Sequence, residues 1–163
     1  MRAPVSGTSD KPVASNPTTT TESSVLFVLI AILALAGMAV SGVSLQRHYA
    51  KSASAFCDFG ERFNCDIVNR SEYSTVMGIP VAAIGVGGYG VLFALATVYR
   101  SRMRTPPYLL VAAFAGLAFA GYLTYIEGYV LETWCILCLS SLALIAMISW
   151  LASVLKVCAG RGA

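Results

Sequence analysis

The sequence contains very little charge: only 12% of its 163 residues are Asp, Glu, Lys or Arg, against 57% hydrophobic residues. Soluble domains carry roughly 25% charged residues, so this composition excludes an ordinary water-soluble domain and indicates a membrane protein. The net charge of +3 is small and scattered along the chain, which argues against a protein that binds nucleic acid.

Histidine is nearly absent, and alternating polar and apolar strands are absent altogether. The single histidine, His48, has no second histidine with which Cys135 and Cys138 would complete the four ligands of a structural zinc site. No metal is therefore expected. Because the apolar segments lack the period-two alternation of membrane barrels, each must be a helix that satisfies its own backbone in hydrocarbon.

Four apolar segments are each long enough to cross a bilayer core of ~30 Å at about 1.5 Å per residue. They run over 25–45, 77–99, 108–131 and 134–157. The predicted fold is all-α, a polytopic four-helix membrane bundle over residues 25–157. Residues 1–24, rich in Ser, Thr and Pro, are expected to form a disordered tail, and 158–163 a short C-terminal tail. A cleaved signal peptide is the alternative, which the long apolar stretch disfavours.

Positive charge is concentrated on one side of this bundle. Seven of the 11 Lys and Arg residues lie in the N-terminal tail, the second loop and the C-terminus. The second loop, Arg100-Ser-Arg-Met-Arg-Thr-Pro-Pro107, is short and purely basic, as cytoplasmic loops tend to be. Both termini are therefore predicted to be cytoplasmic, and the first and third loops to face outward.

Four of the five cysteines fall on that outer side as two pairs. Cys57 and Cys65 lie in the first loop, separated by seven residues, and Cys135 and Cys138 lie at the start of the fourth span. Since a thiolate attacks a disulfide sulfur, two pairs at one end of a bundle predict a redox relay. The i, i+3 spacing of Cys135 and Cys138, called the inner pair below, places both sulfurs on one face of the helix. The N-terminus of a helix also lowers a thiol pKa, because it favours the thiolate. The apolar neighbours of the inner pair suit a flat lipophilic partner better than a metal ion.

Structural roles for the same cysteines are the competing interpretation. Cys57 and Cys65 are also compatible with a loop disulfide that only adds stability, and Cys135 and Cys138 with packing residues in a helix. A non-catalytic membrane scaffold with structural disulfides is thus the alternative hypothesis. Cys158, at the cytoplasmic end, has no predicted partner and is expected to be an unengaged thiol.

An ordered set of short motifs resembles the vitamin K epoxide reductase family in its compact microbial form. The set comprises Cys57-x7-Cys65, Ser71 six residues later, Met77-Gly-Ile-Pro80, Tyr122-Leu-Thr-Tyr-Ile-Glu127 and Trp134-Cys-x-x-Cys138. The resemblance covers roughly residues 25–157. A bacterial membrane oxidase that recharges the periplasmic thiol oxidant has similar parts, but its Cys-x-x-Cys precedes its spaced pair, the reverse of the order here.

The resemblance implies a membrane thiol-disulfide oxidoreductase that supports disulfide bond formation. It is built as a four-helix bundle around a quinone of ubiquinone or menaquinone type, with the loop after the first span as a redox-active cap. It implies that a separate, thioredoxin-like periplasmic thiol oxidase gives electrons to Cys57, and that Cys65 passes them to Cys135 through a transient disulfide between the two pairs. Cys138 is then the sulfur that reacts with the quinone. Ser71 matches a position at the quinone pocket, and a bacterial inner membrane is the implied location.

Two further positions bear on the reaction. Glu127, an acid near the outer end of the third span, is a candidate proton donor for quinone reduction, with a salt bridge or a simple interfacial acid as alternatives. Leu142 stands four residues after the last Cys-x-x-Cys cysteine, where animal members of the family carry a tyrosine. That difference disfavours vitamin K epoxide as a substrate and leaves a quinone or epoxide reductase of vitamin K type as the alternative function.

Overall fold

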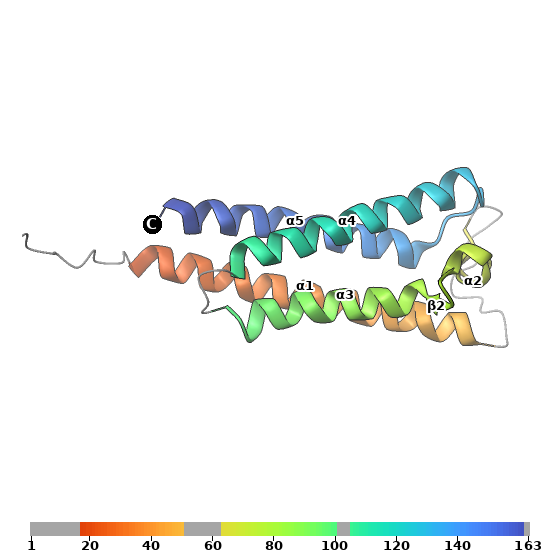
Figure 1. Cartoon of the computed structure of the whole chain (residues 1–163), viewed down its shortest axis with the longest axis horizontal. Helices are drawn as coiled ribbons and strands as arrows, with labels where there is room; N and C mark the ends of the chain where they lie inside the picture. Colours follow the sequence, from red (N-terminus) through yellow and green to blue (C-terminus); the bar gives the residue numbers. More distant parts are fainter. Residues whose placement is uncertain (1–16, 51–62, 101–104, 162–163) are drawn as a thin grey trace, which may run out of the picture.

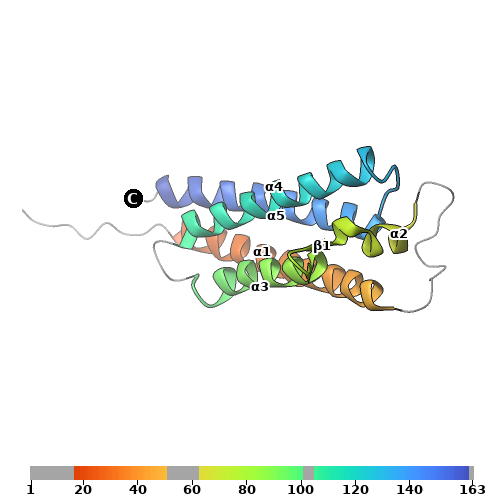
Figure 2. The same ribbon diagram turned by 45° about the vertical axis from the view of Figure 1, so that its right-hand side comes forward.

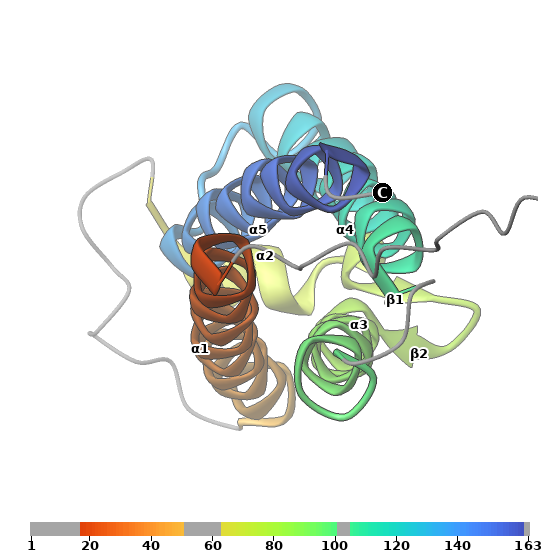
Figure 3. The same cartoon turned by 90° about the vertical axis from the view of Figure 1, so that its left-hand side faces the viewer.

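Four long helices form an up-and-down bundle in the computed structural model, which describes residues 17–50, 63–100 and 105–161. The helices are α1 (Pro17–Tyr49), α3 (Val81–Thr97), α4 (Thr105–Tyr129) and α5 (Ile136–Arg161). Helix α1 packs against α3 and α5, and α4 packs against the same two helices. Viewed along the bundle, α1 and α4 therefore occupy diagonal corners (Figure 3).

A small cap covers one end of the bundle, opposite the end where α1 begins and α5 finishes (Figure 1). It contains α2 (Cys65–Arg70), the 3-10 turn η2 (Glu72–Ser74) and an antiparallel hairpin of β1 (Thr75–Val76) and β2 (Ile79–Pro80). Figure 2 shows α2 and β1 at the cap end of α1 and α3. At the hairpin tip, Met77 and Gly78 adopt positive φ angles of 54° and 82°, the geometry of tight turns that match the twist of paired strands.

The helix boundaries differ from the sequence-based ranges. Helix α1 begins at Pro17, inside the tail predicted for residues 1–24, because proline fits the first helical position, where its missing N–H has no partner to lose. The second helix begins at Val81 rather than at residue 77, since the hairpin turn takes up the preceding residues. The last helix begins at Ile136 and continues to Arg161, so most of the predicted C-terminal tail is helical.

The outer surface of the bundle identifies an integral membrane protein. Within the described ranges, three helices are long and apolar enough to cross a bilayer: Ser23–Tyr49, Thr105–Tyr129 and Ile136–Cys158. Helix α3 is equally apolar but has 17 residues, about 25 Å at 1.5 Å per residue. Large apolar side chains point outward along the helices, as they do where lipid replaces water. They include Val28, Ile32, Leu35, Val111, Phe114, Met147 and Trp150.

Small residues let the helices of the bundle approach each other closely. Ala34, Ala113 and Ala152 are fully buried in the core beside Ile30 and Ile148. Such close approach is the main source of helix association where lipid tails are as apolar as the core itself. Small residues thus pack at the centre of the core.

The tightest of these approaches lies between Gly37 of α1 and the ring of Tyr89 of α3. A Cβ atom added at Gly37 would lie 2.3 Å from the Tyr89 ring, closer than atoms can pack. The hydroxyl of Tyr89 donates to the carbonyl oxygen of Ser141 at 2.8 Å, which fixes the ring between α1 and α5. Movement of the ring away from Gly37 would strain this hydrogen bond.

We predict that Gly37→Ala lowers the thermal unfolding midpoint of the purified protein in detergent. Overpacking of this kind costs about 1–3 kcal/mol, more than the helix propensity that alanine adds. The matched control is Gly42→Ala on the same helix, because a Cβ there meets nothing within 4 Å. Equal midpoints for the two variants would show that the Gly37–Tyr89 contact is not a packing constraint.

Candidate redox site

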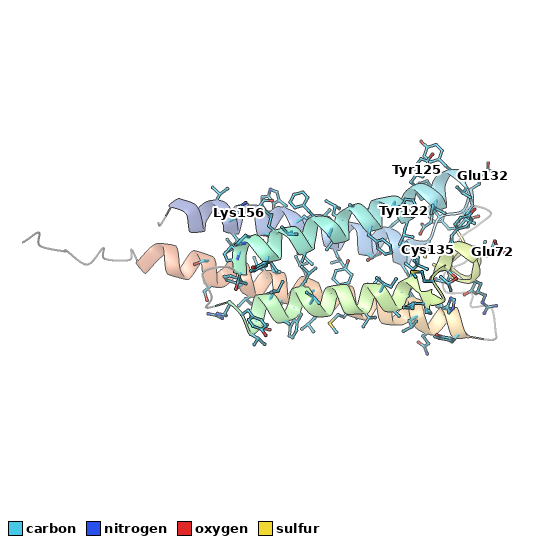
Figure 4. The ribbon with its side chains drawn as sticks, viewed as in Figure 1. Glu72, Tyr122, Tyr125, Glu132, Cys135 and Lys156 are labelled. Carbon is cyan, nitrogen blue, oxygen red and sulfur yellow. The ribbon has the colours of Figure 1, made fainter. Side chains whose placement is uncertain are left out.

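Two extended segments bring Cys65 to the pair formed by Cys135 and Cys138. Phe63 forms a parallel bridge with Trp134, and the N–H of Asn64 donates to the carbonyl oxygen of Trp134 at 3.2 Å. Each segment then continues into a cysteine, so Cys65 and Cys135 lie in one buried cluster, 1% and 0% exposed. Cys135 lies at the cap end of the bundle in Figure 4.

Helix α2 is held over the bundle by hydrogen bonds at both of its ends. At its start, the side chain of Asn64 accepts the N–H groups of Asp66 and Ile67 at 3.0 and 3.1 Å, an N-cap. At its end, Asn69 donates through Nδ2 to the carbonyl oxygen of Cys65 at 2.9 Å and accepts the hydroxyl of Ser44 of α1 at 2.8 Å. These bonds fix Cys65 relative to α1.

The cysteines differ in oxidation state. Cys65 is disulfide-bonded, whereas Cys135, Cys138 and Cys158 are free thiols. Cys57 lies outside the described residues, so its pairing and its role toward a partner stay predictions. Cys158 lies in the last turns of α5, far along that helix from the other two free thiols.

Cys135 is the favoured thiolate of the inner pair. It immediately precedes α5, where its sulfur accepts hydrogen bonds from the thiol of Cys138 and from the backbone N–H groups of Cys138 and Leu137. These bonds lower the pKa of Cys135, the Cys138 thiol contributing most, although burial and the nearby charge of Glu127 oppose them. The lowering of a thiol pKa that is expected at a helix start is therefore found at Cys135.

The side chain of Glu127 contacts both cysteines of the inner pair. Its carboxylate accepts the N–H of Cys135 at 3.2 Å and contacts the thiol of Cys138, and the residue is only 2% exposed. Such burial does not fit a simple interfacial acid. Among the described residues, its hydrogen-bond partners at the carboxylate are the two cysteines rather than a cation.

The turn that joins α4 to α5 builds this arrangement. The N–H of Thr133 donates to the carbonyl oxygen of Glu127 at 3.2 Å, and Glu132 adopts a positive φ of 49°. The indole of Trp134 packs on Gly128, where an added Cβ would lie 3.0 Å from the ring. The turn therefore reverses the chain direction, so that the N–H of Cys135 reaches the carboxylate of Glu127, eight residues earlier.

A cavity of about 410 Å³ opens beside Cys138 inside the bundle. All four long helices and the cap line it, mostly with apolar and small side chains. Its polar lining residues are Ser41, Ser44, His48, Asn69, Ser71, Tyr73, Ser74, Tyr89, Glu127, Cys138 and Ser141. Pockets for small organic ligands have this size and this mixture of an apolar wall with a few polar groups.

The predicted pocket residue Ser71 does line the cavity, but its hydroxyl proton is engaged. The Ser71 hydroxyl donates to the carbonyl oxygen of Val68 at 2.8 Å. It would have to leave that bond before it could donate to a ligand in the cavity. Its predicted role in binding stays a prediction.

Sequence reasoning missed several cavity residues. Tyr89 lies unremarked within the apolar segment 77–99, and His48 entered only as a lone histidine that cannot complete a zinc site. The i, i+4 spacing of Ser44 and His48 on an otherwise apolar helix was the available signal, because that spacing places both on one face. Ser141, rather than Leu142, is the residue at that turn of α5 that lines the cavity.

A buried dithiol beside a lipophilic cavity, carried by a helical bundle with an apolar exterior, defines a membrane oxidoreductase. The sequence profile described as the vitamin K epoxide reductase family matches residues 28–153. The match covers most of the chain, and the chain belongs to this family. The resemblance expected from the ordered motifs is confirmed.

We predict that two substitutions move the pKa of Cys135 in opposite directions. Cys138→Ala removes its main hydrogen-bond donor and should raise the pKa, whereas Glu127→Gln removes a repelling charge and should lower it. The ultraviolet absorbance of the thiolate, followed in a pH titration of the reduced protein, measures both shifts.

The titration uses a Cys158→Ser background, and the spectrum of a Cys135→Ala protein is subtracted. Because the folded pKa of Cys135 is lowered, its thiolate should persist to lower pH in the parent than in Cys138→Ala. Identical titration curves for the parent and both variants would contradict the hydrogen-bonding scheme at Cys135.

Proposed function

We propose that this protein oxidises a separate thioredoxin-like thiol protein and passes the electrons to a membrane quinone of ubiquinone or menaquinone type. The observation that carries the proposal is the burial of Cys65 against Cys135, with Cys138 on the wall of a lipophilic cavity. One side of the inner pair thus meets a disulfide-bonded cysteine, and the other meets a space for an apolar acceptor.

The cavity suits a quinone on its shape and chemistry. A quinone head group is flat and largely apolar, with two carbonyl oxygens that need donors, and the cavity has apolar walls with polar groups near the cap. Cys138 and Glu127 would face one side of the head group and the cap residues the other. Bound there, a quinone accepts two electrons and two protons.

Electron transfer follows from ordinary thiol-disulfide exchange. The partner's dithiol reduces the first-loop pair. The Cys65 thiolate then attacks the sulfur of Cys135 in the oxidised inner pair, which releases the Cys138 thiolate and forms a disulfide between the pairs. Attack by Cys57 on Cys65 releases Cys135 as a thiolate. The inner pair is then reduced while Cys65 is again disulfide-bonded, the distribution seen in the structure.

The proposal includes an orientation in a bacterial inner membrane. Helix α3 connects the cap end to the opposite end, so it would make the fourth crossing. The hairpin of β1 and β2 directly precedes α3 on the outer side and would lengthen this short crossing. The basic second loop and both termini would be cytoplasmic, and the cap periplasmic.

We predict that a cysteine placed at Tyr129 reacts with a membrane-impermeant maleimide in intact cells, whereas Cys158 reacts only after the membrane is permeabilised. Tyr129 is 76% exposed at the cap end of α4, and Cys158 lies at the opposite end of the bundle. Labelling in the reverse order would mean that the cap faces the cytoplasm.

The deciding experiment is quinone reduction by the purified protein, followed optically with a reduced thioredoxin-like oxidase as the donor. Wild type should turn over. Cys138→Ala should abolish turnover, since no second inner sulfur is left to complete the disulfide. Cys65→Ala should abolish turnover with the protein donor yet retain it with a small dithiol that reduces the inner pair directly.

Thermal unfolding of each variant controls for folding. A structural scaffold would give a different pattern: both pairs resistant to the donor, no turnover with any quinone, and alanine variants that only lose stability. That pattern would overturn the proposed function.

A further inference from the structure

A polar group on α1 and the cap faces the cavity from the corner opposite Glu127. The Nδ1 atom of His48 lies 2.6 Å from the carbonyl oxygen of Asn69, and Ser44, one turn earlier on α1, donates to the side chain of the same Asn69. His48 and Asn69 both line the cavity, as does Glu127. Helices α1 and α4 occupy diagonal corners of the bundle (Figure 3), so His48 and Glu127 join the cavity lining from helices on opposite sides.

The hydrogen bond to Asn69 determines the tautomer of His48. A carbonyl oxygen only accepts, so Nδ1 must carry a proton in this bond. Ser74 lies 3.4 Å from the same nitrogen, but its hydroxyl donates to the carbonyl oxygen of Ser71 at 2.7 Å. The nitrogen at which His48 gains or loses a proton is therefore Nε2.

The other hydroxyl donors around the cavity are largely committed within the protein. Ser44 donates to Asn69, Ser71 to Val68, and Tyr89 to Ser141. Imidazole is also the side chain that exchanges a proton readily in neutral water. On the α1 and cap side of the cavity, away from Cys138 and Glu127, His48 is thus the described side chain best suited to deliver a proton.

The chemistry of the inner pair calls for such a donor. When the Cys135 thiolate and the Cys138 thiol form a disulfide, they give up two electrons but only one proton. Reduction of a quinone to a quinol takes up two electrons and two protons, one at each of two oxygens on opposite sides of the ring. One proton must therefore reach the oxygen that points away from Cys138.

We propose that His48 is the second proton donor of the reaction, acting from the α1 wall on the acceptor oxygen remote from Cys138; this inference rests on the proposed function. As the disulfide between Cys135 and Cys138 forms, the thiol proton of Cys138 goes to the near oxygen. His48 gives the Nε2 proton to the far oxygen and becomes a neutral imidazole that keeps its Nδ1 proton toward Asn69. Water at the cap restores the Nε2 proton, because His48 is only half-buried.

Other ionisable groups lie around this end of α1 and the cavity. They lie on α1 itself, on α2, on η2, and across the cavity on α4 and α5. They are Arg47, Asp66, Arg70, Glu72, Tyr73, Glu127 and Cys138. The pH profile of the His48→Asn protein must therefore be compared with that of wild type, because these groups are common to both.

The test compares wild type with His48→Asn, in which the amide nitrogen replaces Nδ1 and preserves the donor to Asn69 but cannot transfer a proton. Reduced protein is mixed with a short-chain benzoquinone in a single turnover, and quinol formation and proton uptake from an indicator dye are followed across neutral pH. Equilibrium binding of the same quinone is measured separately. Tyr49→Phe is the matched control, because Tyr49 is exposed and is not part of the cavity lining.

We expect the wild-type rate to fall as pH rises, because the donor form is the protonated imidazole. His48→Asn should bind the quinone within about twofold of wild type, yet reduce it roughly 100-fold more slowly, the usual contribution of a general acid, with the pH-dependent fall abolished. Added imidazole should restore part of the rate in His48→Ala. Tyr49→Phe should behave as wild type.

Two results would overturn the proposal. A His48→Asn protein with the wild-type rate and pH profile would show that His48 transfers no proton. Parallel loss of quinone binding or of electron transfer from Cys65 in His48→Asn would show that His48 only holds the cap. Failure of wild type to reduce any quinone would instead overturn the proposed function, which the separate donor assay identifies.

Discussion

The pairing of Phe63 with Trp134 is the interaction on which the site depends. One hydrogen bond, from the N–H of Asn64 to the carbonyl oxygen of Trp134, ties the cap to the turn that precedes α5. Because the next residue on each segment is a cysteine, this pairing alone sets Cys65 beside Cys135. The packing of the Trp134 ring on Gly128 then prevents the turn from sliding along α4.

Buried polar groups reinforce that geometry because an unsatisfied one is costly in a low-dielectric interior. Asn69 joins α2 to α1 through Ser44 and His48 and returns to the backbone of Cys65. Glu127 performs the matching task on the other side by accepting the N–H of Cys135. Cys65 and Cys135, the two cysteines proposed to exchange electrons, are thus each held by a polar group anchored in a different membrane helix.

The same geometry separates the two sulfurs of the inner pair by role. Cys135 accepts hydrogen bonds at the start of α5 and is buried against Cys65, whereas Cys138 points to the cavity. The thiolate therefore forms at the sulfur proposed to exchange with Cys65, and the proton stays on the sulfur nearest the proposed acceptor. A single helix start and an i, i+3 spacing are enough to produce this division.

The sequence by itself determined the membrane class, the helical bundle, the four cysteines of interest and the family, because apolar length, basic loops and motif order are local properties of the chain. Its helix starts were less well predicted, since the Met77–Gly78 turn and Pro17 obey backbone constraints that hydropathy does not reveal. Only the tertiary structure decided which residues share the cavity. His48, Asn69, Tyr89 and Glu127 come from four different elements, and their meeting depends on helix packing and on the cap, which no pattern within one segment encodes.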